Sequence, residues 1–132
     1  MSTALSNTIE NGWDNRASIT PQTHGEIREA VETVLAALDR GALRVAEKKD
    51  GGWVVNQWVK QAILLSFRLN DNRLVDGATC DGEIARWYDK VPLKTTGWDE
   101  AHFKQAGFRA VPGSVVRAGA FVDTGVVLMP SF

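Results

Sequence analysis

A chain of 132 residues with 44% hydrophobic content is long enough to bury one ordinary core. Its 15 basic and 16 acidic residues leave a formal charge of -1, which argues against nucleic acid and anionic membranes as partners. The single cysteine, Cys80, has no second cysteine to pair with and no Cys/His cluster spaced for zinc, so we expect no metal site and a reducing compartment. Because the N-terminus lacks an export signal and no long apolar run occurs, we expect a soluble, cytoplasmic protein.

Two amphipathic helices are predicted in the first third of the chain. Apolar residues recur every fourth position between residues 5 and 13, which indicates a short helix. A longer helix is expected to follow, with Thr20 as its N-cap and Pro21 at its first helical position. It should end before Gly41, a residue that suits a left-handed cap. Its apolar stripe consists of Ile27, Ala30, Val31, Val34, Leu35 and Leu38.

The apolar period then changes to two and back to helical. Leu43 and Val45 alternate along an extended run, and a turn at residues 49–52 leads into a second run, which predicts a β-hairpin. Asn56 can cap a third helix over residues 57–70, whose apolar side chains surround most of its circumference, so we expect it to be central and nearly buried. Four tryptophans are interpreted as core and interface anchors, since no basic stripe accompanies them: Trp53, Trp58, Trp87 and Trp98.

Shorter elements are predicted in the next part of the chain. Residues 73–94 mix short extended pieces with a polar loop at residues 78–83. Asp99 can cap a short helix that Gly107 would close, and residues 108–111 then lead on as an extended segment. Residues 1–113 are therefore expected to form one α+β domain, in which helices accompany a small antiparallel sheet.

From Val116 onward, aliphatic and small residues recur with a spacing of six. Val116, Val122 and Leu128 occupy the first position of each hexapeptide, and three residues that favour a corner occupy the second: Arg117, Asp123 and Met129. This spacing predicts that residues 114–132 begin a left-handed hexapeptide β-helix and stop within its first coil. An ordinary edge hairpin would share the pattern, because alternating small and aliphatic residues are common in strands.

Three segments resemble one known family in sequence and in order. They are GALRVAEKKDGGWVVNQWVKQAILLSFRLNDN at residues 41–72, YDKVPLK at residues 88–94, and GFRAVPGSVVRAGAFVDTGVVLMPSF at residues 107–132. These segments are similar to the first half of the tetrahydrodipicolinate N-succinyltransferases, although the stretch GATCDGEIARW looks longer than its counterpart in that family. The resemblance implies an α+β N-terminal domain that leads into the first coil of a left-handed hexapeptide β-helix. The family's further coils are expected to lie outside this sequence.

The resemblance also implies an activity. Family members transfer a succinyl group from succinyl-CoA, a co-substrate rather than a bound cofactor, to the amino group of ring-opened tetrahydrodipicolinate in diaminopimelate and lysine synthesis. They act as homotrimers on this small dicarboxylate. The 132 residues alone are expected to lack activity, because the family's acid/base and CoA-binding segments lie beyond them. Two alternatives remain open: a non-catalytic interaction or assembly module, and a related hexapeptide acetyltransferase.

Arg109, in the motif GFR, is the one residue that we expect in a site. The resemblance implies that it binds the acceptor, and a guanidinium group suits a carboxylate because its fork donates two parallel hydrogen bonds. The alternative is a surface arginine whose stem covers Phe108. Arg117 is a weaker candidate, because an arginine at a β-helix corner is usually solvated. We expect structural or solvated roles for Asp123, His24 and His102, and assign no catalytic residue.

Overall fold

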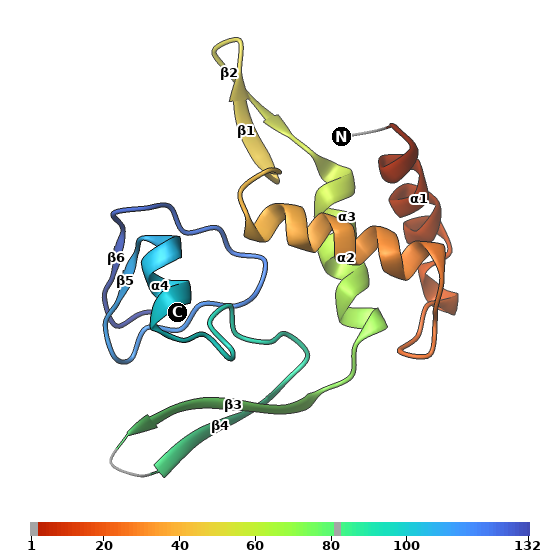
Figure 1. Cartoon of the computed structure of the whole chain (residues 1–132). Coiled ribbons are helices and arrows are strands. Elements are labelled where there is room, and N and C mark those ends of the chain that lie inside the picture. The colour runs from red at the N-terminus through yellow and green to blue at the C-terminus, as the bar shows by residue number, and fades with distance from the viewer. Residues whose placement is uncertain (1–2, 81–82) are drawn as a thin grey trace. The chain divides into compact units, whose positions relative to one another are not determined.

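The computed structural model describes residues 3–80 and 83–132 and divides into two compact units, Met1–Asp71 and Asn72–Phe132 (Figure 1). Helices and small antiparallel sheets supply most of the regular structure in the described residues, which confirms the predicted α+β class. Within the same residues, none of the helices has both the length and the apolar character needed to cross a bilayer.

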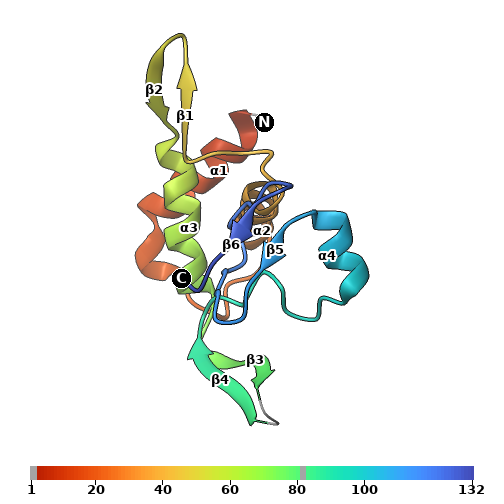
Figure 2. The same ribbon diagram turned by 90° about the vertical axis from the view of Figure 1, so that its left-hand side faces the viewer.

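Three α-helices form the first unit. They are α1 (Thr3–Asp14), α2 (Glu26–Asp39) and α3 (Gln57–Leu69), and a short 3-10 helix, η1 (Arg16–Ser18), follows α1. Helix α2 lies across α3 in Figure 1 and is seen end-on in Figure 2. The apolar stripes of the helices meet in a core that is closed to solvent, with Ile9, Val34, Val59 and Leu65 fully buried.

A glycine lets α1 approach α2 closely. A Cβ atom at Gly12 would lie 2.3 Å from Cδ1 of Ile27, so any larger residue there would displace this side chain of the core. The predicted stripe of α2 is confirmed, because Ala30, Val31, Val34 and Leu38 are all buried. The helix also ends as expected, since Gly41 has a φ of +74° just after it.

The start of α2 differs from the prediction. The helix begins at Glu26 after Gly25, and not at Pro21. Thr20 and Thr23 instead close a turn on each other, with the Thr23 N–H donating to the Thr20 carbonyl and the Thr20 N–H donating to Oγ1 of Thr23. The turn uses the hydrogen bonds that a helical N-cap would have made, so the cap signal at Thr20 was wrong.

The predicted hairpin is present, with its turn and second strand where they were expected, but its first strand begins later, at Ala46. Strand β1 (Ala46–Lys49) pairs with β2 (Gly52–Val55) in antiparallel register, and both residues of the tight turn have positive φ, +50° at Asp50 and +83° at Gly51. Leu43 and Val45, expected in the first strand, pack against the core instead. The hairpin thus carries few core contacts of its own.

Helix α3 is less enclosed than predicted. Val59, Ala62, Leu65 and Leu69 are buried on one side, but Leu64 on the other side is 37% exposed. Of the tryptophans expected to anchor the core, Trp58 packs against it. Two others do not, because 73% of Trp53 and 40% of Trp87 are exposed, so their prediction as core residues was wrong. Their prediction as interface residues remains a prediction.

The second unit begins with a hairpin where only short extended pieces and a polar loop were predicted. Strand β3 (Arg73–Cys80) pairs antiparallel with β4 (Glu83–Asp89), and the register shifts between Asp76 and Thr79. The polar loop predicted at residues 78–83 was therefore wrong at both ends, which are strand, while residues 81–82 lie outside the described residues.

A short helix and a pair of short strands complete the second unit. Helix α4 (Glu100–Ala106) is followed by β5 (Arg109–Ala110), which pairs in parallel with β6 (Val127–Leu128). Residues 92–94 run alongside residues 116–118, with an antiparallel bridge between Leu93 and Arg117. Contacts thus group residues 72–132 together, and the boundary expected at residue 113 remains a prediction.

Candidate functional site

Helix α4 is held at both ends by local interactions that the sequence predicted. Asp99 forms a capping box with His102: the His102 N–H donates to Oδ1 of Asp99 at 3.0 Å, and the Asp99 N–H lies 3.3 Å from Nδ1 of the imidazole. Hydrogen bonding from the backbone N–H and the ring of His102 keeps the pKa of Asp99 below its ordinary value. At the other end, Gly107 adopts the left-handed conformation of a C-cap.

Aromatic rings fix α4 against the segment that follows it. Trp98 meets Phe103 edge-on with ring centroids 5.2 Å apart, and Phe108 lies 5.8 Å from Trp98 and 6.0 Å from Phe103. Phe108 is only 6% exposed, so it anchors the residues on either side of it. Successive side chains of an extended segment point to opposite faces. The burial of Phe108 therefore directs its neighbour Arg109 outward.

Arg109 is exposed and stands on strand β5, whose backbone pairs with β6. Its N–H donates to the Val126 carbonyl at 2.9 Å, and the Val111 N–H donates to the Leu128 carbonyl at 2.9 Å. The side chain borders a shallow cavity of about 410 Å³, which we call the Arg109 cavity. It is lined by Glu100, Phe103, Lys104, Gly107, Phe108, Arg109, Gly125, Val126 and Val127.

The charges around the Arg109 cavity favour an anion at Arg109. Nζ of Lys104 lies 2.7 Å from Oε1 of Glu100, one helical turn earlier, so these two exposed charges satisfy each other. The part of the chain that the structure describes supplies no such carboxylate to Arg109. Apolar side chains of Phe103, Phe108 and Val126 form much of the remaining lining. The cavity can thus offer one guanidinium fork and an apolar surface to a ligand with a carboxylate group.

Arg117 lies in a different place and has a partner that sequence reasoning missed. Its Nη2 is 2.5 Å from Oδ2 of Asp89, and both residues line a second cavity of about 850 Å³ with Trp87, Leu93 and Val116. Arg117 is exposed, as expected, but it also forms an ion pair that joins β4 to residues 114–132. Asp89 lies in YDKVPLK, one of the three segments that resemble the family, and this was the signal available.

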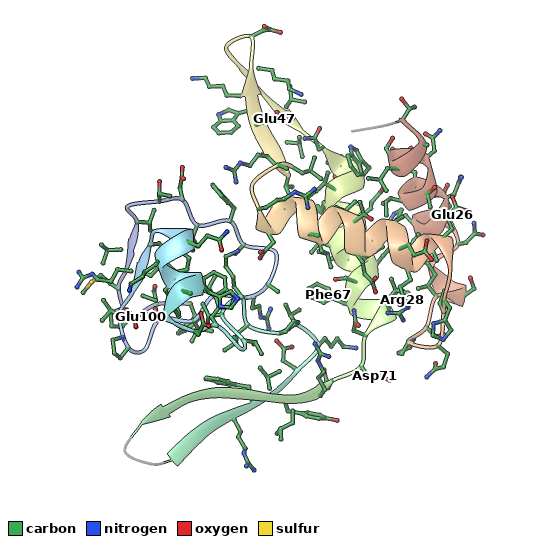
Figure 3. The ribbon with its side chains drawn as sticks, in the orientation of Figure 1. Glu26, Arg28, Glu47, Phe67, Asp71 and Glu100 are labelled. Atoms are coloured by element: carbon green, nitrogen blue, oxygen red, sulfur yellow. The ribbon has the colours of Figure 1, made fainter. Side chains whose placement is uncertain are left out.

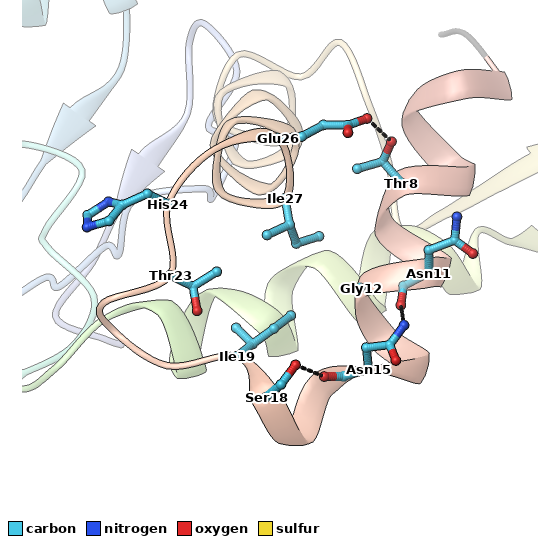
Figure 4. A pocket seen from close by; sticks show the side chains of 10 residues that line it. All are labelled: Thr8, Asn11, Gly12, Asn15, Ser18, Ile19, Thr23, His24, Glu26 and Ile27. Carbon is cyan, nitrogen blue, oxygen red and sulfur yellow. Dashed lines mark hydrogen bonds between the residues drawn. The ribbon is translucent and has the colours of Figure 1, made fainter.

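Asp123 and His102 make structural contacts, and His24 is exposed. Oδ1 of Asp123 accepts the N–H of Thr124 at 2.8 Å, in agreement with a structural role. His102 belongs to the capping box described above. His24 precedes α2 and borders a third cavity of about 460 Å³, whose polar walls come from α1, η1 and the loop before α2 (Figure 4). There, Oγ1 of Thr8 donates to Glu26 at 3.0 Å. In the described residues, no cluster of three His, Cys, Asp or Glu side chains could hold a metal ion.

Comparison with known proteins assigns the chain to a family. Residues 4–69 match the family model for the N-terminal domain of tetrahydrodipicolinate N-succinyltransferase, which places the first unit among the N-terminal domains of acyl-group transferases. The match to individual relatives runs through both units. Proteins named 2,3,4,5-tetrahydropyridine-2,6-dicarboxylate N-succinyltransferase are 58% identical in Paramagnetospirillum magneticum, 57% in a Methylobacterium strain and 55% in Serratia proteamaculans, over 97–98% of this chain. The chain belongs to the tetrahydrodipicolinate N-succinyltransferase family, and it spans about 45% of the length of these curated relatives.

Proposed function

We propose that this chain is the N-terminal part of an enzyme that transfers a succinyl group from succinyl-CoA to the amino group of ring-opened tetrahydrodipicolinate, in diaminopimelate and lysine synthesis. The observation that carries the proposal is the high identity, over nearly the whole chain, to relatives that bear this enzyme's name. The complete enzyme is proposed to act as a cytoplasmic homotrimer. Succinyl-CoA is then a co-substrate that binds and leaves in each turnover.

We further propose that β5 and β6 begin a left-handed hexapeptide β-helix. Two observations support this. Arg109 pairs with Val127 and Ala110 with Leu128, so the parallel strands are offset by 18 residues, which is the length of three hexapeptides. Ala110, Val116, Val122 and Leu128 are also spaced by six and are all half-buried, as expected for the inner face of a coil that a further coil would cover.

In this proposal Arg109 binds a carboxylate of the acceptor. The reaction needs an amine held against a thioester carbonyl, so fixing the acceptor's carboxylates contributes orientation rather than bond-making. A guanidinium group on a paired strand is suited to the task, because its two parallel N–H groups define the direction of the carboxylate plane. The hydrogen bonds of β5 to β6 and the buried Phe108 beside it limit the freedom of the Arg109 backbone.

The test is Arg109→Lys in the complete polypeptide that carries these residues. Lysine keeps the charge but replaces the fork with a single ammonium group, so we expect the KM for tetrahydrodipicolinate to rise about tenfold while the KM for succinyl-CoA stays within about twofold. Arg68→Lys, on an exposed face of α3, is the matched control. Release of CoA, followed with a thiol reagent, gives both constants. Unchanged acceptor KM and kcat would remove Arg109 from the site.

The donor is tested on the same protein. Turnover with acetyl-CoA at the rate seen with succinyl-CoA would replace the succinyltransferase proposal with that of a hexapeptide acetyltransferase. Absence of CoA release from the complete polypeptide with either donor would favour the non-catalytic module.

A further inference from the structure

The turn between α4 and β5 is pressed against the segment that leads into β6. Gly107 has φ +72° and ψ 16°, and its N–H donates to the Phe103 carbonyl at 2.9 Å, which ends α4. Its own carbonyl accepts the N–H of Gly125 at 2.7 Å. A Cβ atom at position 107 would lie 2.9 Å from Cγ2 and 3.3 Å from Cβ of Thr124. Real Cβ atoms essentially never come within 3.0 Å of another heavy atom, so a side chain at position 107 requires either Thr124 or the turn to shift.

This close contact sits two residues before Arg109. The Arg109 N–H donates to the Val126 carbonyl, so the segments around Gly107 and Gly125 are tied together on both sides of Phe108. Phe108 is buried against Trp98 and Phe103. If a side chain at position 107 pushed the turn away from Thr124, the strand that carries Arg109 would have to tilt about this buried ring.

We propose that Gly107, seated against Thr124, is a positioning residue that fixes the direction in which Arg109 presents its guanidinium group to the acceptor. The inference rests on the proposed role of Arg109 and adds a residue that lines the Arg109 cavity and acts through Arg109. A displacement of about 1 Å in a group that orients a substrate can lower the rate by as much as a hundredfold, so a small shift of the turn suffices for a measurable effect.

Another glycine of the same unit separates this contact from simple backbone strain. Gly97 has almost the same backbone angle, φ +74°, but a Cβ atom added there meets nothing within 4 Å. Gly97→Ala therefore imposes the left-handed strain alone. Gly107→Ala imposes that strain together with the contact to Thr124. The difference between the two variants isolates the contact.

The experiment compares three variants of the complete polypeptide: Gly107→Ala, Gly97→Ala, and a double variant that combines Gly107→Ala with Thr124→Ser. Arg109→Lys is assayed beside them. Far-UV circular dichroism and thermal unfolding check that each variant folds. The Thr124→Ser change removes Cγ2, the nearest atom, and leaves Cβ at 3.3 Å, a tight but tolerable distance.

We expect Gly107→Ala to raise the KM for tetrahydrodipicolinate on the order of tenfold, with the KM for succinyl-CoA within about twofold of wild type. Gly97→Ala should leave both constants near wild type. Adding Thr124→Ser to Gly107→Ala should restore most of the acceptor affinity. If Gly107→Ala does not fold, Gly107→Asn takes its place beside Gly97→Asn, because asparagine tolerates the left-handed region while retaining a Cβ atom.

Two results would overturn the inference. The first is equal acceptor constants for the Gly107 and Gly97 variants. The second is a Gly107 variant whose loss is spread equally over acceptor, donor and kcat and is not rescued by Thr124→Ser. Either result together with a raised acceptor KM in Arg109→Lys would refute the positioning role and leave the proposed function standing. An unchanged Arg109→Lys enzyme would refute both.

Discussion

Arg28 makes three hydrogen bonds to backbone carbonyls of the first unit, and its removal gives a sharp test of how that unit is held together. The guanidinium group donates to three backbone carbonyls at 2.8 Å each: Nε to Thr23, and Nη2 to both Pro21 and Leu69. Figure 3 labels Arg28 on α2 near the C-terminal end of α3. One side chain thereby joins the loop before α2 to the last carbonyl of α3, which a helix end leaves without an intrahelical partner.

We expect Arg28→Met to destabilise the chain by roughly 2–4 kcal/mol. A hydrogen bond from a charged donor contributes about 1.5–3 kcal/mol, so three of them would give an upper bound well above this range. The Arg28 side chain is 20% exposed, however, and water can reach some of the released carbonyls, which lowers the estimate. Methionine retains much of the aliphatic stem, so the lost hydrogen bonds dominate the effect.

Urea unfolding of the 132-residue chain, followed by circular dichroism at 222 nm, measures this change because most of the helix lies in the first unit. Arg28→Lys should recover less than half of the loss, since one ammonium group cannot replace a fork aimed at three acceptors. Arg68→Met, on the exposed face of α3, is the control and should change stability by less than about 0.5 kcal/mol. If Arg28→Met lowered the free energy of unfolding as little as Arg68→Met does, the three hydrogen bonds of Arg28 would have no energetic role.

Two further predictions concern the core and the α4 cap. Leu65→Ala should cost about 2–5 kcal/mol in the same urea assay, because Leu65 is fully buried, whereas the neighbouring Leu64→Ala, at a 37% exposed position, should cost less than about 1 kcal/mol; similar losses for both would contradict the assigned core. Asp99 has a lowered pKa, so its ionised form stabilises α4 above the ordinary value of 3.8, and this contribution is lost as the pH falls through the lower folded pKa. Hydrogen exchange of the α4 amides should therefore distinguish wild type from Asp99→Ala at pH 6, and the difference should shrink towards pH 2.5. A difference that stays constant over this range would exclude the carboxylate as its source.

Local patterns in the sequence predicted the elements whose ends are fixed by local contacts. Helix α4 is the clearest case, because Asp99 and Gly107 lie at its two ends and satisfy its terminal groups without help from elsewhere. The stripe of α2 and its closure near Gly41 were predicted for the same reason. In these elements, the residue that determines the boundary lies within one turn of it.

The errors occurred where a distant contact competes with a local signal. Thr20 and Pro21 carry a good helix-start signal, yet the Arg28 guanidinium binds the Pro21 carbonyl and also reaches Leu69, 41 residues further on. Asn56 likewise precedes α3 as a cap should, but its side chain donates to the Arg44 carbonyl and to Glu47 instead. Neither contact can be read from a window of a few residues.

The candidate site combines both kinds of information. Its residue, Arg109, came from a motif resemblance, and the repeat of six in the last part of the chain predicted an aliphatic row. The contact between the Gly107 turn and Thr124 joins residues that are 17 positions apart in the sequence. It depends on the register in which their two segments lie side by side, which the spacing of six alone does not determine. The parallel pairing of β5 with β6 sets that register. A glycine that looks like an ordinary helix C-cap in the sequence thus becomes, in the fold, the residue on which the direction of Arg109 depends.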